Sequence, residues 1–290
     1  MNPCPVCSSA SFQHLFRCRP NRPDIPGTYS VVQCRVCRAE YLGDPPPLGV
    51  LNELYRILHD TTNNREDSPR RSTPTIWLVR FWRRWNGYPV GDAIDCGPVL
   101  DVGCGSGALL AELSARGIVA RGVDWDSQAI SLCQRSGLDA TVGDISSGMF
   151  EVRKYRWVVF SHVLEHLHDP IRVLQNASSL LEPAGKLLIC VPNSKSPCRY
   201  IFGHQWHGWD APFHFIHYDT QSLTRICSAA GLRVTRVVRR VLPDDFRRSW
   251  IHLTGRDGRY VAARLALLPV TALMSTLGFG SFLLVTATSK

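Results

Sequence analysis

The run VLDVGCGSGALLAEL, from Val99 to Leu113, constrains the fold more than any other part of the chain. Its first four residues are apolar except for Asp101, as in a buried strand, and Ala108 to Leu113 has the apolar spacing of a helix face. Three glycines lie at alternate positions between them: Gly103, Gly105 and Gly107. Glycines allow positive φ angles and remove every Cβ that would hold a ligand away from the backbone, and a helix that begins there directs free N–H groups into the same space. The run predicts a strand, a nucleotide-binding turn and a helix.

The spacing of the glycines narrows the class of ligand. GxGxG differs from the GxGxxG of dinucleotide dehydrogenases, and no GK[ST] follows that would hold a triphosphate. A ligand without phosphates therefore fits better. The next two predicted strands end on acidic residues, Asp124 and Asp144. Asp124 lies roughly 20 residues beyond the turn, the distance at which an acidic side chain reaches ribose hydroxyls in folds of this kind.

Two further predicted strands extend the pattern, one at Tyr155 to Ser161 and one at the end of Pro183 to Asn193. From about Val99 to Asn193 the chain resembles class I S-adenosylmethionine methyltransferases. The resemblance implies an α/β fold, a Rossmann-like seven-stranded sheet with helices on both faces. It also implies S-adenosylmethionine as cofactor, with its methionine end on the glycine turn, its ribose on Asp124 and its adenine beside Asp144. The predicted cofactor residues are Asp101, Gly103, Gly105, Gly107, Asp124, Trp125, Asp144, Ile145 and Ser161.

Two CxxC pairs near the N-terminus predict a metal site: Cys4 with Cys7, and Cys34 with Cys37. Four thiolates on two tight turns suit tetrahedral zinc, and such a site is structural because it leaves no open position for catalysis. We therefore predict a zinc ribbon over residues 1–45, with Cys18 as a buried thiol outside the site. The chain has an odd total of eleven cysteines, and it begins without a basic and apolar leader. These features favour a reduced, cytoplasmic protein.

The segment SHVLEHLHDP, Ser161 to Pro170, is a candidate for catalysis because it follows a predicted strand at the crevice of the sheet. His162, Glu165 and His166 share one face if the segment is helical. Methyl transfer needs an aligned acceptor and a base, and histidine titrates in a suitable range. The segment resembles the EHL-type motif of quinone and small-molecule O-methyltransferases, some of which bind a divalent cation there; His162 replaces their carboxylate. Alternatively, Glu165 and His166 only brace the loop.

Residues 196–218 are rich in histidine and aromatic side chains and predict an insertion that lines the substrate pocket. The segment resembles W-x-x-x-x-P-x-H-x-x-H-(F/Y) of methyltransferases that act on small molecules or sugars. Phe213 stands where those proteins commonly carry a basic residue after the proline. The predicted catalytic residues are His162, His166 and His214, whereas His204, His207 and His217 are predicted to be structural.

The remaining segments complete the predicted organisation. Residues 46–95 form a basic, helical linker or cap, and residues 96–290 form the methyltransferase domain. Near the end of that domain, Asp219 to Ala230 predicts a helix and Leu232 to Val241 a strand. The chain then carries no charge from Leu265 to Ser289. We divide this tail between a helix at 259–277, either a lid or a membrane-surface helix, and a last antiparallel strand at Gly280 to Thr288.

The predicted function is S-adenosylmethionine-dependent O- or C-methylation of a small-molecule, sugar or lipid-linked acceptor. The net charge of +9 leaves contact with RNA or with the inner face of a membrane open. One alternative is a ribosomal-RNA base methyltransferase with a zinc ribbon, although no [DNS]PP[FYW] motif follows the fourth predicted strand. A second alternative is a zinc-ribbon protein that binds its ligand without turning it over.

Overall fold

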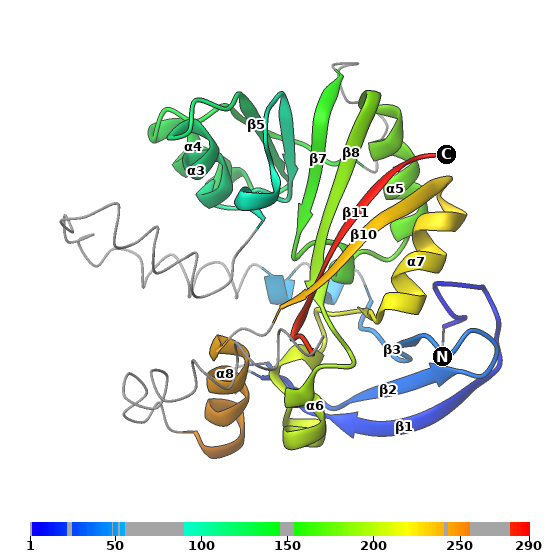
Figure 1. Cartoon of the computed structure of the whole chain (residues 1–290). Coiled ribbons are helices and arrows are strands. Elements are labelled where there is room, and N and C mark those ends of the chain that lie inside the picture. The colour runs from blue at the N-terminus through cyan, green and yellow to red at the C-terminus, as the bar shows by residue number, and fades with distance from the viewer. Residues whose placement is uncertain are drawn as a thin grey trace.

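The computed structural model describes residues 2–21, 25–47, 49–51, 53–55, 90–145, 154–240, 243–255 and 279–290. Most of the predicted cap at 46–95 and the whole predicted helix at 259–277 lie outside these ranges. The described residues form two β-sheets, and helices pack on both sides of the larger one (Figure 1).

The larger sheet has seven strands in the order β10-β11-β8-β7-β4-β5-β6. They are β4 (Val99–Val102), β5 (Ala120–Asp124), β6 (Ala140–Val142), β7 (Tyr155–Ser161), β8 (Leu181–Pro192), β10 (Leu232–Arg240) and β11 (Phe282–Ser289). Five strands, from β8 to β6, pair in parallel, whereas β11 pairs antiparallel with both β8 and β10. The predicted seven-stranded Rossmann-like sheet is confirmed, including its last antiparallel strand.

Four helices in the described ranges cover this sheet. They are α3 (Ala108–Ser114), α4 (Ser127–Arg135), α5 (Pro170–Ser179) and α7 (Thr220–Ala229). All except α3, whose N-cap is Gly107, have an aspartate cap. The Asp126 carboxylate accepts the Gln128 N–H at the start of α4, and Asp219 forms a capping box with Ser222 at the start of α7. Figure 1 shows α3 and α4 on one side of the sheet and α5 and α7 on the other. Helices therefore lie on both sides of the sheet, and the central strands β4 and β7 are almost completely buried.

The smaller sheet joins the N-terminal region to a distant part of the chain. Its strands are β1 (Phe12–Cys18), β2 (Tyr29–Cys34), β3 (Glu40–Leu42) and β9 (Ile216–His217), in that order. The short β9 pairs antiparallel with β3, so that Glu40 lies opposite His217 and Tyr41 opposite Ile216. We call residues 2–21 and 25–47 the cysteine module. Its sheet is completed by a strand from the predicted 196–218 insertion, and the boundary at residue 45 stays a prediction.

The segment after β8 packs against α8 (Pro243–Thr254) at one end of the larger sheet (Figure 1). It contains α6 (Pro197–Phe202) and two 3₁₀ turns at Gly203–Gln205 and His207–Trp209. The buried Asp245 carboxylate accepts hydrogen bonds from Trp206 Nε1 at 3.0 Å and from Ser196 Oγ at 3.2 Å, which fixes α8 against the insertion. Among the described residues, none of the helices has both the length and the apolar character needed to cross a bilayer.

Candidate cofactor, acceptor and metal sites

The glycine turn follows β4, and its three glycines have different surroundings. Their φ angles are +70° at Gly103, +51° at Gly105 and +81° at Gly107, all in the left-handed region. A Cβ on Gly103 would collide with the Val163 side chain, and one on Gly107 would lie 2.7 Å from Leu138 Cδ1. A Cβ on Gly105 would meet no atom of the described residues within 4 Å. The outer two glycines thus serve packing, and the middle one faces the open side of the turn.

Asp124 ends β5 directly beside this turn. Its Oδ2 accepts the Gly105 N–H at 2.9 Å, and its Oδ1 accepts the Asp126 N–H at 2.9 Å. Each carboxylate oxygen has a second acceptor position that these bonds do not use. The next residue, Trp125, is 55% exposed and contacts the Tyr55 ring edge to face at 5.7 Å. A carboxylate bonded to the glycine turn is therefore followed directly by an exposed aromatic ring.

The other predicted cofactor residues lie at the same edge of the sheet. Val142 pairs with Asp124, so Asp144 follows β6 near the end of β5, where it is exposed. Ile145 is buried, and its carbonyl accepts Asn176 Nδ2 at 3.0 Å. Asp101, inside β4, is only 3% exposed. Burial, together with the nearby charge of Asp124, raises the pKa of the Asp101 carboxyl to about 7.

The segment after β7 turns sharply, and only Leu164–His166 forms a single 3₁₀ turn. His162 has a φ of +58°, and its Nδ1 lies 3.2 Å from Oε1 of Glu165. Glu165 is 1% exposed, and its buried Oε2 accepts no hydrogen bond from the part of the chain that the structure describes. Burial by itself raises the pKa of this carboxyl. The hydrogen bond from His162 and the charges of the nearby histidines outweigh burial, so the pKa is lowered to about 2. Glu165 is therefore a buried carboxylate held by histidines.

The hydrogen bonds of two histidines determine which of their nitrogens carries a proton. His166 Nδ1 lies 3.0 Å from the Phe213 carbonyl, and His214 Nδ1 lies 3.0 Å from the Gly208 carbonyl. Because a carbonyl only accepts, both Nδ1 atoms donate, and in the neutral rings each Nε2 holds a lone pair. Burial and the charge of His214 lower the pKa of His166 to about 4, so its ring is neutral at pH 7. Asp210 Oδ2 lies 3.7 Å from His214 Nε2.

His162, His166 and His214 surround one cavity of about 390 Å³. Its walls include Ser161, His162, His166, Trp206, Asp210 and His214. One donor atom from each of Glu165, His166 and His214 lies within 4.8 Å of the other two, a spacing that suits a divalent cation. Val163 packs against Gly103, so this segment also touches the glycine turn. The structure thus brings all three predicted catalytic histidines to one cavity, and the residue after His162 packs against the predicted cofactor turn.

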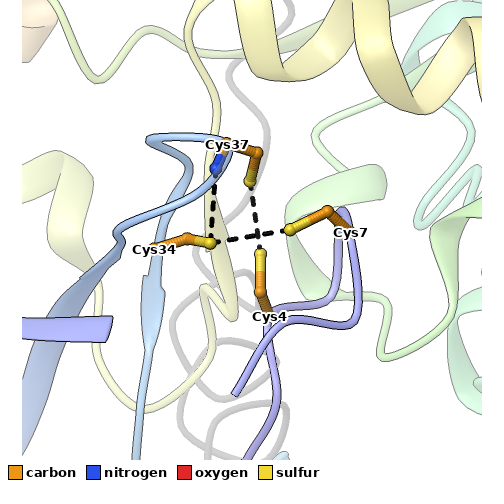
Figure 2. A group of neighbouring side chains, drawn as sticks. All are labelled: Cys4, Cys7, Cys34 and Cys37. Atoms are coloured by element: carbon orange, nitrogen blue, oxygen red, sulfur yellow. Dashed lines mark hydrogen bonds between the residues drawn. The ribbon is translucent and has the colours of Figure 1, made fainter. Parts of the chain in front are cut away.

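The four predicted metal ligands meet between the two CxxC turns (Figure 2). Cys4 Sγ lies 3.5 Å from Cys37 Sγ, and Cys7 Sγ lies 3.5 Å from Cys34 Sγ. Tetrahedral zinc with bonds of about 2.3 Å places its sulfurs about 3.7 Å apart. Burial raises the pKa of the Cys34 thiol, but the backbone N–H groups of Cys37 and Val36 bring it down to about 7. The donor set and its spacing fit a structural zinc ion.

Comparisons with known proteins agree with this fold. The profile of a family described as a methyltransferase domain matches residues 72–237. The chain belongs to this methyltransferase family. The cysteine module lies before the matched range.

Curated relatives of this methyltransferase are named ubiquinone biosynthesis O-methyltransferase. The protein of Coxiella burnetii strain Dugway 5J108-111 is 28% identical over 150 residues, which cover 47% of this chain and 63% of the relative. The protein of Coxiella burnetii strain RSA 331 / Henzerling II is 31% identical with the same coverage. The chain thus spans a little under two thirds of the length of these relatives.

Solved structures share the fold of this methyltransferase at low sequence identity. A Thermotoga maritima S-adenosylmethionine-dependent methyltransferase, described as a possible histamine N-methyltransferase, is 16% identical with a TM-score of 0.56, covering 81% of this chain and 99% of that one. The [4+2]-cyclase SpnF is 17% identical with a TM-score of 0.55, covering 84% and 97%. Because one of these two is named as a cyclase, the fold by itself does not define the reaction.

The structure adds residues that the sequence analysis does not predict for the site. Tyr55 and Asp210 contact the histidine cluster, and His207, predicted to be structural, lies on the cavity wall. Asp210 precedes His214 by four residues in the sequence, and this spacing could have identified Asp210 as a partner of His214. The predicted pocket segment is also more deeply packed than expected, since Trp209 is 2% exposed and contacts Phe16 edge to face at 4.9 Å.

Proposed function

We propose that this protein transfers the methyl group of S-adenosylmethionine to a hydroxyl group of a small molecule. The observation that carries the proposal is that Val163, which follows the cavity residue His162 in the chain, packs against Gly103 of the cofactor turn. The names of the relatives that match about half of the chain support an O-methyl product. The cavity volume of about 390 Å³ suits an acceptor of small-molecule size.

The residues of the glycine turn fit this cofactor. The methionine end of S-adenosylmethionine has room on the open side of Gly105. The acceptor positions of Asp124 that its backbone hydrogen bonds leave unused match two ribose hydroxyls. We assign the adenine to the space between Trp125 and the Asp144–Ile145 pair. When bound, the cofactor supplies an electrophilic methyl group on a sulfonium. The turn and Asp124 align that group with the cavity.

We assign the role of general base to His214. Its Nε2 lone pair is available for the acceptor's hydroxyl proton, and the Asp210 carboxylate 3.7 Å away would stabilise the imidazolium that results. His166 is a poorer base, since its pKa is lowered to about 4. We assign His166 to orienting the hydroxyl. His162 holds the Glu165 carboxylate, whose charge faces the same cluster.

We further propose that Cys4, Cys7, Cys34 and Cys37 hold one structural zinc ion, which ties the two CxxC turns together. Contact with RNA or with the inner face of a membrane stays a prediction.

The test is methyl transfer from tritium-labelled S-adenosylmethionine to a panel of phenols, with total RNA as a parallel acceptor. We expect label on a phenol and none on RNA. His214→Asn should lower kcat about 100- to 10,000-fold while leaving the Kd for S-adenosylmethionine unchanged. His204→Asn is the matched control, because His204 is an exposed histidine of the same segment. Label on RNA instead of on any phenol would contradict the proposal.

A further inference from the structure

Asn21, in the connection between β1 and β2, reaches across to the insertion that carries His214. Its Nδ2 lies 2.6 Å from the carbonyl oxygen of His207 and 3.1 Å from Oδ1 of Asp210. Nδ1 of His207 lies 3.2 Å from the same nitrogen. An amide nitrogen donates two hydrogens, and both the carbonyl and the carboxylate are acceptors. Asn21 therefore bonds to both ends of the turn from His207 to Asp210.

This turn positions both ring nitrogens of His214. The Gly208 carbonyl, inside the turn, accepts from His214 Nδ1 at 3.0 Å, and the Asp210 carboxylate at its end lies 3.7 Å from Nε2. The Asp210 carbonyl also accepts the backbone N–H groups of Phe213 at 2.9 Å and of His214 at 3.1 Å. Asp210 itself has a φ of +31°, a conformation that a residue with a side chain adopts only with support from its surroundings.

We propose that Asn21 is a positioning residue for the acceptor-site histidine His214, and that the cysteine module is thereby part of the acceptor site. Asn21 orients Asp210, which in turn orients His214 toward the cavity. The expected effect of Asn21 on kcat rests on the proposed function. The expected effect of Asn21 on the orientation of His214 rests on the hydrogen bonds alone.

The cysteine module is attached to the insertion by other contacts as well. The buried Glu40 carboxylate pairs with Lys195 Nζ at 3.1 Å and Arg199 Nη1 at 2.8 Å, and β3 pairs with β9. Removing the Asn21 amide therefore leaves the module in place. A loss of activity on substitution of Asn21 then reports on the His207–Asp210 turn, not on detachment of the module.

The experiment compares Asn21→Asp with Asn21→Ala. Asn21→Asp keeps the shape of the side chain but directs a carboxylate at the Asp210 carboxylate and the His207 carbonyl. We expect it to lower kcat for the acceptor at least 10-fold, and more than Asn21→Ala does, with an unchanged Kd for S-adenosylmethionine. If Asn21 only filled space, the ranking would be reversed, because alanine removes more atoms. Gln13→Glu is the control: Gln13 Nε2 donates to Gln33 Oε1 within the module, and we expect wild-type kcat.

A second readout does not depend on turnover. In protein with ¹⁵N-labelled histidine, with the His214 signals assigned by loss in His214→Asn, the wild type should show the proton of His214 on Nδ1. Asn21→Asp should shift this ¹⁵N pattern, whereas Gln13→Glu should not. An unchanged His214 pattern in Asn21→Asp, or a larger loss of kcat in Asn21→Ala, would overturn the proposal. If the wild type methylates no phenol, the proposed function fails while the ¹⁵N pattern still decides the role of Asn21.

Discussion

The Asp124 carboxylate accepts the backbone N–H of Gly105 at 2.9 Å, so the acidic end of β5 is bonded to the middle glycine of the turn after β4. Both oxygens of Asp124 are directed by backbone N–H groups, the second by that of Asp126. The predicted ribose site and the predicted methionine site are therefore held in one arrangement by the protein alone. Such preorganisation reduces the entropy that a ligand loses when it binds.

Asp124→Ala should raise the Kd for S-adenosylmethionine at least about 100-fold, since it removes two charged hydrogen bonds to the ribose. Isothermal titration calorimetry measures the Kd, and circular dichroism checks that the fold is intact. Asp126→Ala is the matched control. Asp126 caps α4, so this change should lower the free energy of unfolding by about 1 kcal/mol and leave the Kd unchanged. An unchanged Kd in Asp124→Ala would show that the ribose lies elsewhere.

Gly105→Ala and Gly117→Ala separate backbone strain from ligand contact. Both glycines have positive φ angles, +51° and +70°, and at neither does the added Cβ come within 4 Å of an atom in the described ranges. Each change should lower the free energy of unfolding by about 1 kcal/mol. Only Gly105→Ala should also weaken S-adenosylmethionine binding, because its methyl group enters the open side of the turn. Equal Kd values for the two variants would place the ligand away from Gly105.

The titration of Asp101 should make stability depend on pH. Its pKa is about 7 in the folded protein, against an ordinary value of 3.8. Between these values the folded state holds a proton that the unfolded state lacks, so the free energy of unfolding falls as pH rises, by at most about 1.4 kcal/mol per pH unit from this group. Asp101→Asn carries no such proton. In urea denaturation, the free energy of unfolding of Asp101→Asn relative to that of the wild type should therefore be higher at pH 8 than at pH 5. The same difference at both pH values would contradict this prediction.

Zinc content tests the cysteine cluster. Cys34→Ser should reduce bound zinc from one ion per chain to well below one, as measured by mass spectrometry of the metal, and should lower Tm by several degrees, since structural zinc stabilises its domain. Cys18→Ser is the control, because Cys18 is a buried cysteine of the same module whose thiol lies outside the cluster. Full zinc content in Cys34→Ser would exclude it as a ligand.

The parts of the fold that could be predicted from the sequence are those with local patterns. The apolar run at Tyr155 to Ser161 predicts β7 with the bounds that the structure shows, because a strand buried on both faces needs apolar side chains at nearly every position. Likewise the glycine spacing identifies the turn before α3. The two CxxC pairs identify the cysteine cluster, since a metal requires several ligands at fixed short spacings.

Contacts between distant residues could not be predicted in this way. Asn21 is a single polar residue in a connection, and its partner Asp210 is 189 residues away. No sequence motif around Asn21 or Asp210 predicts that these two residues contact each other. The two-residue strand β9 is likewise too short for a periodic pattern. The segment after β7 suggested a helical face, but the left-handed backbone at His162 leaves room for only one 3₁₀ turn.

The pairing of β3 with β9 has a consequence for how the protein is made. At the usual rate of about 5 to 20 residues per second, ribosomes need roughly 10 to 35 s to proceed from β3 to β9. The four cysteines leave the ribosome before β9 does, and until β9 is made the edge of β3 has free backbone groups. Binding of the proposed zinc ion can therefore precede synthesis of the segment that carries β9 and His214, which would then fold onto strands that the metal already holds together.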